Sequence, residues 1–327
     1  MLDELDARPP QAFRPLVAAC VRSAKQILEQ GNGLVPLREC PACGADGLEE
    51  AFVKHGYGYR HCPKCWSLFA SPRPSAEQLR WYLEDSPAAE YRRGERYVEE
   101  ISPRVRELAR YRASWVRELV PSEYADQPII VVEPRSYAFP EQLYEQGYHR
   151  LVAVAPRVPA GDGPLAKSGI EVCADLSEPA GNSARVAAVF DVLEYQRDPV
   201  GLLAEVYRAL APGGYLMLST RSASGFDIQT LWEHSDVFPL EHVNLPSVEG
   251  IRELLGTIGY QVLEISTPGL LDLQIIRRVA DEVGPSAIPR FLRYFLAKRN
   301  AGSADRLQEF LQSHRLSSHM RVLARKP

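Results

Sequence analysis

Residues 186–220 read VAAVFDVLEYQRDPVGLLAEVYRALAPGGYLMLST, and this stretch decides the fold. An apolar run is followed by an acidic residue, then by a helical pattern at 199–210, then by a second apolar run at 215–220 after a Pro-Gly-Gly turn. Apolar strands that alternate with helices are typical of a mostly parallel sheet covered by helices on both faces. The stretch therefore predicts an α/β protein.

The same alternation extends on both sides of this stretch. Further apolar runs predict strands at 129–132, 151–155, 170–172 and 260–265, and helical patterns predict helices near 139–147 and at 247–259. The chain then closes on a short strand. We expect 121–327 to form one α/β domain, with a helical insertion at about 268–316.

The N-terminal third has a different pattern. An N-terminal helix is expected within 1–35, because apolar residues there lie on one helical stripe that a Gly-Asn-Gly turn ends. Residues 36–74 are rich in turns, and 75–120 are helical and heavily charged. We interpret these two stretches as a small metal-binding ribbon and a helical linker.

Composition and charge exclude several function classes. The net charge of −4 gives no electrostatic argument for nucleic acid as a partner. No apolar run approaches the roughly 20 residues that span a bilayer, so no membrane association is expected. The first residues, MLDELDARPPQ, are acidic and polar, unlike a signal peptide. A cytoplasmic location is the resulting expectation.

Four of the six cysteines form two pairs, Cys40-Pro-Ala-Cys43 and Cys62-Pro-Lys-Cys65. This spacing suits four thiolates around a tetrahedral Zn²⁺, two from each tight turn. With four protein ligands such a site is closed, and it is therefore expected to be structural. The alternative is four unrelated thiols. His55 and His61 are interpreted as surface residues, and Cys20 and Cys173 as core residues.

Several segments resemble class I S-adenosylmethionine-dependent methyltransferases. Residues 189–220 are similar to that superfamily's fourth strand, next helix, Pro-Gly-Gly turn and fifth strand, and 241–272 to the segment that follows. In one bacterial subfamily a zinc ribbon precedes the methyltransferase domain, and that ribbon is similar to residues 59–91, YRHCPKCWSLFASPRPSAEQLRWYLEDSPAAEY. Residues 317–327 resemble the last strand of the same subfamily. The resemblance covers roughly 36–327. It implies a Rossmann-like fold and a small-molecule methyltransferase, often one associated with sugars and surface polysaccharides.

The cofactor loop departs from the pattern of these relatives. Their first strand ends in an acidic residue and a glycine-rich turn, which lets the backbone lie against the cofactor. Here Glu133 supplies the acidic position, but Pro134, Arg135, Ser136, Tyr137 and Ala138 follow it. Arg135 and Tyr137 add bulk, and Pro134 removes an amide donor.

The other strand ends depart from the pattern as well. The second strand ends at Ala155, where relatives carry an acid that binds the ribose hydroxyls, and this loss is worth roughly 1.5–3 kcal/mol. After the fourth strand, Asp191 is followed by Tyr195, where relatives commonly carry histidine. Asp175 retains a contact to the adenine amino group in this interpretation. The cofactor S-adenosylmethionine is therefore doubtful.

Two interpretations remain open. The domain is either a pseudo-methyltransferase that has lost ordinary cofactor binding, or a divergent active enzyme. Arg135 and Arg157 shift the pocket toward positive charge, which suits a phosphate-bearing ligand such as a nucleotide-sugar. Alternatively, both arginines lie on the surface.

If the protein is catalytic, a general base is expected after the fifth strand. The candidates are His234, Glu241 and His242, together with Asp236. The alternative for His242 is a structural hydrogen bond that fixes its loop. A third hypothesis is an interaction subunit with a protein partner, in which aromatic residues of 81–83 or Trp232 serve either as anchors or as packing between ribbon and domain.

Overall fold

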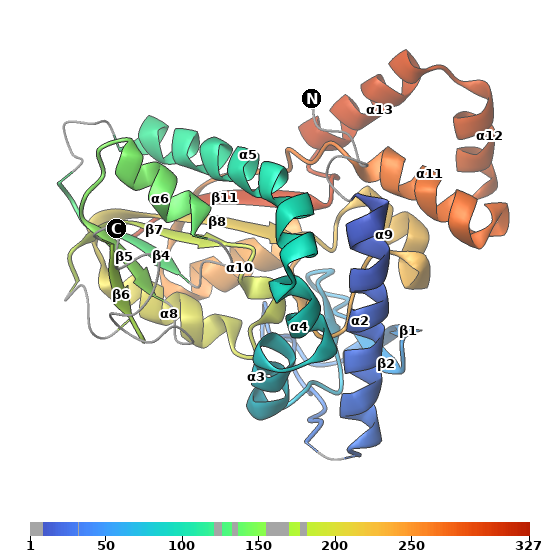
Figure 1. Cartoon of the computed structure of the whole chain (residues 1–327), viewed down its shortest axis with the longest axis horizontal. Coiled ribbons are helices and arrows are strands. Elements are labelled where there is room, and N and C mark those ends of the chain that lie inside the picture. The colour runs from blue at the N-terminus through green and yellow to red at the C-terminus, as the bar shows by residue number, and fades with distance from the viewer. Residues whose placement is uncertain (1–8, 32, 121–125, 133–136, 155–169, 177–181) are drawn as a thin grey trace.

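The computed structural model describes residues 9–31, 33–120, 126–132, 137–154, 170–176 and 182–327. Figure 1 shows three regions: a large α/β body, a small sheet with helices beside it, and an arm of three C-terminal helices. Among the described residues, no helix combines the length and the apolar character that crossing a membrane requires.

A seven-stranded sheet forms the centre of the α/β body. In spatial order its strands are β10 (Gln261–Ser266), β11 (His319–Arg325), β8 (Leu210–Arg221), β7 (Ala184–Phe190), β4 (Ile129–Val132), β5 (Leu151–Val154) and β6 (Glu171–Cys173). β11 is antiparallel to both of its neighbours, and the pairs from β8 to β6 are parallel. The predicted mostly parallel sheet is confirmed.

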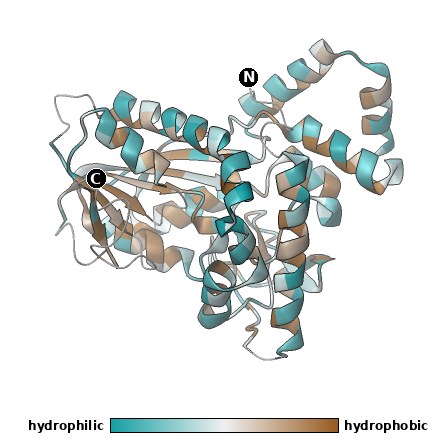
Figure 2. Cartoon of the chain, in the orientation of Figure 1, coloured by the Kyte–Doolittle hydropathy of each residue, from teal (hydrophilic) through white to brown (hydrophobic). Residues whose placement is uncertain are grey.

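The middle strands are apolar along their whole length because both faces of the sheet are covered. All residues of β4 and β5 are buried, whereas the edge strand β10 has exposed positions. Helices α5 (Glu95–Leu119) and α6 (Ala138–Glu145) pack on one face. Helices α8 (Pro199–Ala209) and α10 (Val248–Ile258) pack on the other. Figure 2 shows the hydrophobic strands between helices whose outer faces are hydrophilic.

Local signals fix the ends of the helices around the sheet. Asp198 caps α8 by accepting a 2.8 Å hydrogen bond from the Gly201 amide, and Pro199 occupies the first turn. Ser247 caps α10 by accepting from the Gly250 amide, and α10 ends at Gly259 in the left-handed conformation, φ 109°. These caps set where α8 and α10 begin and where α10 ends.

The N-terminal part consists of helices and a four-stranded sheet. The helices are α2 (Pro10–Glu29), α3 (Ala76–Glu84) and α4 (Pro87–Arg93), and the sheet order is β1 (Glu49–Lys54), β2 (Tyr57–His61), β3 (Leu68–Ala70) and β9 (Asn244–Leu245). The strand β9 comes from the α/β body, after β8. The small sheet is therefore completed by a segment nearly 180 residues away, and the two parts share a hydrogen-bonded ladder.

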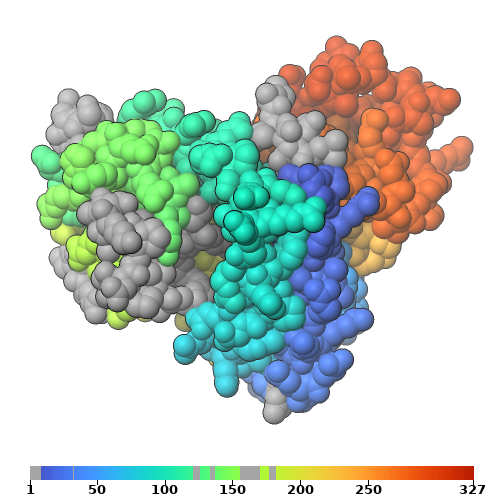
Figure 3. Space-filling view, viewed as in Figure 1, coloured from blue at the N-terminus to red at the C-terminus, as the bar shows by residue number. Residues whose placement is uncertain are grey.

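Three helices form the arm between β10 and β11: α11 (Asp272–Val283), α12 (Arg290–Lys298) and α13 (Ala301–Ser313). The buried Asp272 carboxylate ties α11 to the start of β11, because it accepts hydrogen bonds from Ser317 Oγ and, at 2.9 Å, from the Ser318 amide. Figure 3 shows the arm as an orange lobe next to the blue helix α2. Arg278 of α11 lies over the Phe13 ring of α2, 5.6 Å from its centroid.

The segment between β8 and β9 carries short helices. They are α9 (Phe226–Leu231) and the 3-10 helix η3 (Trp232–His234), and a further 3-10 helix, η2 (Leu193–Tyr195), follows β7. Both segments begin where a central strand ends, at the edge of the sheet where ligands bind in open α/β folds.

Candidate functional site

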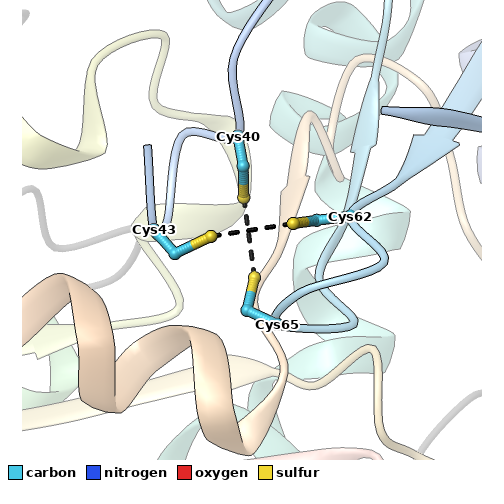
Figure 4. A group of neighbouring side chains, drawn as sticks. All are labelled: Cys40, Cys43, Cys62 and Cys65. Atoms are coloured by element: carbon cyan, nitrogen blue, oxygen red, sulfur yellow. Dashed lines mark hydrogen bonds between the residues drawn. The ribbon is translucent and has the colours of Figure 1, made fainter. Parts of the chain in front are cut away.

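Two tight turns bring four cysteines together beside the small sheet (Figure 4). The Sγ atoms of Cys40 and Cys65 are 3.6 Å apart, as are those of Cys43 and Cys62, and all four lie within 4.8 Å of one another. A tetrahedron of thiolates at the zinc–sulfur distance has edges of about 3.8 Å. The four sulfur atoms therefore have a geometry that fits one tetrahedral metal ion.

Both turns have the same backbone construction. The residue after the second cysteine donates its amide to the carbonyl of the first, Gly44 to Cys40 at 2.9 Å and Trp66 to Cys62 at 2.8 Å. Both residues have positive φ, 68° for Gly44 and 61° for Trp66. Glycine adopts this conformation freely, whereas for tryptophan it is unfavourable by about 1–2 kcal/mol. The second turn therefore needs stabilising contacts from its surroundings.

The cluster is buried, and the pKa values of its thiols are shifted in opposite directions. Cys40, Cys62 and Cys65 are at most 2% exposed. The hydrogen bond between Cys40 and Cys65 lowers the pKa of Cys65 to about 5 and raises the pKa of Cys40. Because four protein sulfurs complete a tetrahedral shell, a metal held here has no open position for substrate. The site can serve structure rather than catalysis.

A second polar cluster lies where β7 and β8 end. Asp191 follows β7 at a φ of 55° and forms an ion pair with Arg112 of α5. It also accepts a 2.8 Å hydrogen bond from Ser219 Oγ. The guanidinium of Arg112 lies over the Phe190 ring, 4.8 Å from its centroid. Both oxygens of the Asp191 carboxylate are thus engaged inside the protein.

The charges around Asp191 shift two pKa values. Burial alone would raise the pKa of Asp191, but Arg112, His319 and the Ser219 hydrogen bond together hold it well below its ordinary value. Burial lowers the pKa of His319, and Arg112 and Arg104 lower it further, against the opposing effect of Asp191. At neutral pH, the cluster therefore combines an ionised carboxylate, guanidinium groups and a neutral imidazole.

The predicted cofactor residues divide between described and undescribed parts of the chain. Glu133, Arg135, Ser136, Ala155 and Arg157 lie outside the described residues. Asp175 is exposed after β6, Tyr137 directly precedes α6, and Tyr195 is buried in η2. Of the predicted set, the structure places Asp191 within a network of charged partners.

The predicted catalytic residues have structural partners. His242 Nδ1 accepts a 2.9 Å hydrogen bond from the Phe238 amide, as the loop-fixing alternative requires. Glu241 pairs with Arg92 and accepts from the Tyr82 hydroxyl at 2.8 Å. The half-buried His234 lies 3.8 Å from Glu233. General-base roles for His234, Glu241 and His242 stay predictions.

The aromatic residues considered as partner anchors lie between the ribbon and the α/β body. Tyr82 is fully buried. Trp232 packs edge-on against Phe52 of β1, with ring centroids 5.2 Å apart, and donates a 3.0 Å hydrogen bond to the Ala51 carbonyl. Both side chains therefore serve packing between the two parts.

Sequence reasoning did not identify Arg112, Ser219 or His319. They come from α5, β8 and β11, elements that the fold brings together but that no motif connects. Ser219 was signalled weakly, since it is a polar residue within the apolar run at 215–220. Arg112 and His319 carry no such local signal.

Comparison with known proteins supports one family. The sequence model of a family described as "Methyltransferase domain" matches residues 99–265, just over half of the chain. A search of curated proteins finds no match.

Solved structures with similar folds include three methyltransferases. An S-adenosylmethionine-dependent methyltransferase from Mesorhizobium loti has 18% identity and a TM-score of 0.40, over 65% of this chain and 97% of that one. Geranyl diphosphate C-methyltransferase from Streptomyces coelicolor has 12% identity and a TM-score of 0.45, over 72% and 85%. The 1,6-didemethyltoxoflavin N1-methyltransferase from Burkholderia thailandensis has 12% identity and a TM-score of 0.45, over 85% and 99%.

Proposed function

The chain belongs to the methyltransferase-domain family, and from this membership we propose a pseudo-methyltransferase of small-molecule or sugar metabolism. Its fold is that of the class I S-adenosylmethionine-dependent enzymes, with an added four-cysteine ribbon. The proposal is that the ordinary cofactor binds weakly or not at all.

The observation that carries this proposal is the internal pairing of Asp191. A carboxylate at the end of a central strand attracts a cofactor hydroxyl less strongly when the protein already neutralises its charge. Here Arg112 forms an ion pair with Asp191, and Ser219 donates a hydrogen bond to it. Each oxygen can still accept another bond, but a ligand hydroxyl gains less free energy from a paired carboxylate than from an unpaired one.

The sequence adds two further losses in the same pocket. The loop at 134–138 has no glycine, and Ala155 replaces the acidic residue of relatives. The sum of these losses is about 3–4 kcal/mol, which moves a micromolar site to hundreds of micromolar or beyond. In the sequence Arg135 and Arg157 follow the strands β4 and β5, and their positive charge makes a phosphate-bearing ligand, such as a nucleotide-sugar, the preferred alternative ligand.

Titration calorimetry with S-adenosylmethionine tests the proposal. We expect a dissociation constant weaker than ~100 μM. Ala155→Asp alone is expected to leave the affinity low, because the loop at 134–138 still lacks glycine. Low-micromolar affinity of the unmodified protein would contradict the proposal and favour an active divergent methyltransferase, with His242 as the first residue to substitute.

We also propose that the four cysteines bind structural Zn²⁺. The buried, closed tetrathiolate geometry supports this choice, since zinc prefers four-coordinate sulfur sites. Elemental analysis of the purified protein should find about one zinc per chain. A folded, metal-free protein with four freely titratable thiols would contradict it.

A further inference from the structure

The second cysteine turn is joined to the start of α10 by a buried network. The Ser247 hydroxyl donates to the Cys65 carbonyl, and the Ser247 amide donates to Ser67 Oγ at 3.1 Å. Ser67 Oγ in turn lies 3.3 Å from Cys65 Sγ. Ser67, Ser247 and Cys65 are at most 2% exposed. The α/β body therefore supplies contacts directly behind a predicted metal ligand.

Helix α10 approaches both turns closely. A Cβ atom at Gly250 would lie 2.0 Å from Ser67 Oγ and 3.3 Å from Ala42 Cβ of the first turn. Only glycine permits this approach. Four thiolates with a divalent ion carry a net charge of about −2, and the positive end of a helix stabilises such a charge. The position of α10 suits a metal-loaded cluster.

A second set of contacts continues from the ribbon to the segment after β7. β3 pairs with β9 through Phe69 and Asn244. The buried Arg73 binds Asn244 Oδ1 and donates to the Arg197 carbonyl at 2.9 Å. Asn244 Nδ2 donates to the Leu193 and Gln196 carbonyls at 2.8 and 2.6 Å.

These contacts reach the candidate ligand site. Residues 193–197 follow Asp191 directly, so the two side chains of Arg73 and Asn244 hold the backbone that leaves the end of β7. A small apolar cavity lined by residues of the first turn, β3 and this segment, including Ala42, Phe69 and Leu193, lies at the same junction.

We propose that the metal-loaded ribbon holds the 191–197 segment in place, with Arg73 and Asn244 as positioning residues. Metal binding fixes the two cysteine turns, and the turns fix β3, β9 and the start of α10. The strand β9 in turn fixes the segment after β7. The inference rests on the proposed metal site but is independent of which ligand the α/β body binds.

Hydrogen–deuterium exchange with and without a zinc chelator tests the link, after zinc has been quantified. We expect removal of zinc to speed exchange at least tenfold in peptides covering 191–198 and 242–250. Residues 138–145 of α6, on the other face of the sheet, serve as the control and should keep their rate. Exchange that also becomes faster in α6 overturns the proposal, and so does an unchanged exchange rate at 191–198.

Two glycines of α10 provide a matched pair of variants. Gly250→Ala should weaken zinc binding at least tenfold in competition with a chromogenic chelator, because the new methyl group collides with Ser67. Gly256→Ala lies in the same helix, and apart from the helix's own backbone no described atom lies within 4 Å of its Cβ position, so this variant should bind zinc like the unmodified protein. Equal affinities for the two variants overturn the proposal.

The variant Asn244→Ala tests the positioning of the 191–197 segment separately from metal binding. This variant should retain one zinc per chain, yet show fast exchange at 191–198 without any chelator. Unchanged exchange at 191–198 in the zinc-loaded variant contradicts a positioning role for Asn244. If the unmodified chain binds no metal, both this inference and the proposed zinc site are overturned. If it binds zinc but exchange at 191–198 does not change when zinc is removed, only the inference is overturned.

Discussion

The cysteine cluster and the cluster around Asp191 are built in opposite ways. The four cysteines come from two turns that share one backbone pattern, each with a positive φ after the second cysteine. Asp191 meets its partners only because α5, β8 and β11 pack together. The first cluster is encoded locally, within each turn, and the second by the tertiary fold.

This difference has energetic consequences. A metal ion binds the folded ribbon and has no comparable site in the unfolded chain, so its binding free energy adds to the stability of the fold. The Arg112–Asp191 pair gains from Coulomb attraction but loses hydration on burial, and the net contribution is modest. Disrupting the two clusters should therefore have effects of different size.

The largest effect is expected from Cys62→Ala. Loss of one of four ligands should reduce bound zinc from about one per chain to near zero and lower the melting temperature by ~10 °C or more. Cys173→Ala removes the same atoms from a buried cysteine in β6, 4% exposed. It should cost about 1 kcal/mol, or ~2–4 °C, and leave zinc in place. Elemental analysis and thermal unfolding measure both; equal losses of stability would contradict the comparison.

An intermediate effect is expected from Arg112→Ala, which leaves Asp191 without its cation. The Asp191 side chain is 35% exposed, so water offsets part of the loss, and about 1–2 kcal/mol is the expected cost in denaturant unfolding. Arg110→Ala, at an exposed position of the same helix, should change stability by less than about 0.5 kcal/mol.

A double variant isolates the pair. Arg112→Ala combined with Asp191→Asn should cost less than the sum of the two single changes, by at least ~0.5 kcal/mol, because the asparagine carries no charge to leave unpaired. Strict additivity would show that the ion pair contributes nothing to stability.

The sheet was predictable because its strands carry their pattern in sequence. β4, β5 and β7 are almost wholly apolar, as strands covered on both faces must be. The boundaries were less well predicted: β8 begins at Leu210, five residues before the predicted start, because the Pro-Gly-Gly turn itself joins the strand. The cysteine spacing predicted the metal cluster for the same local reason.

The rest of the site depends on contacts between distant segments. Nothing in the pattern around Arg112 indicates that α5 places it on Asp191, 79 residues later. The strand β9, only two residues long, has no periodicity to detect, yet it joins the ribbon to the α/β body. For this reason the ribbon was expected as a separate stretch, and its shared sheet was not foreseen.

The last effect depends on pH and concerns protons at the Asp191 cluster. Burial, together with Arg112, Arg104 and Arg321, lowers the pKa of His319 below its ordinary value of about 6.5, although Asp191 opposes the shift. Below pH 6.5 the unfolded chain therefore binds a proton at His319 that the folded chain does not. Stability from this group falls as pH falls, until the folded pKa is reached.

His319→Gln should remove this part of the pH dependence. Between pH 7.5 and 5.5 the unmodified protein is expected to lose more stability than the variant. The extra loss is up to about 1.4 kcal/mol for each pH unit below 6.5, as long as His319 is protonated in the unfolded chain and neutral in the folded chain. Guanidinium unfolding of both proteins at the two pH values measures the difference. Asp191, whose pKa is lowered, contributes stability that is lost only near and below pH 3.8, and it does not interfere in this window. Identical slopes for the two proteins would show that His319 keeps its ordinary pKa, and that the arginines around the Asp191 cluster are screened by water.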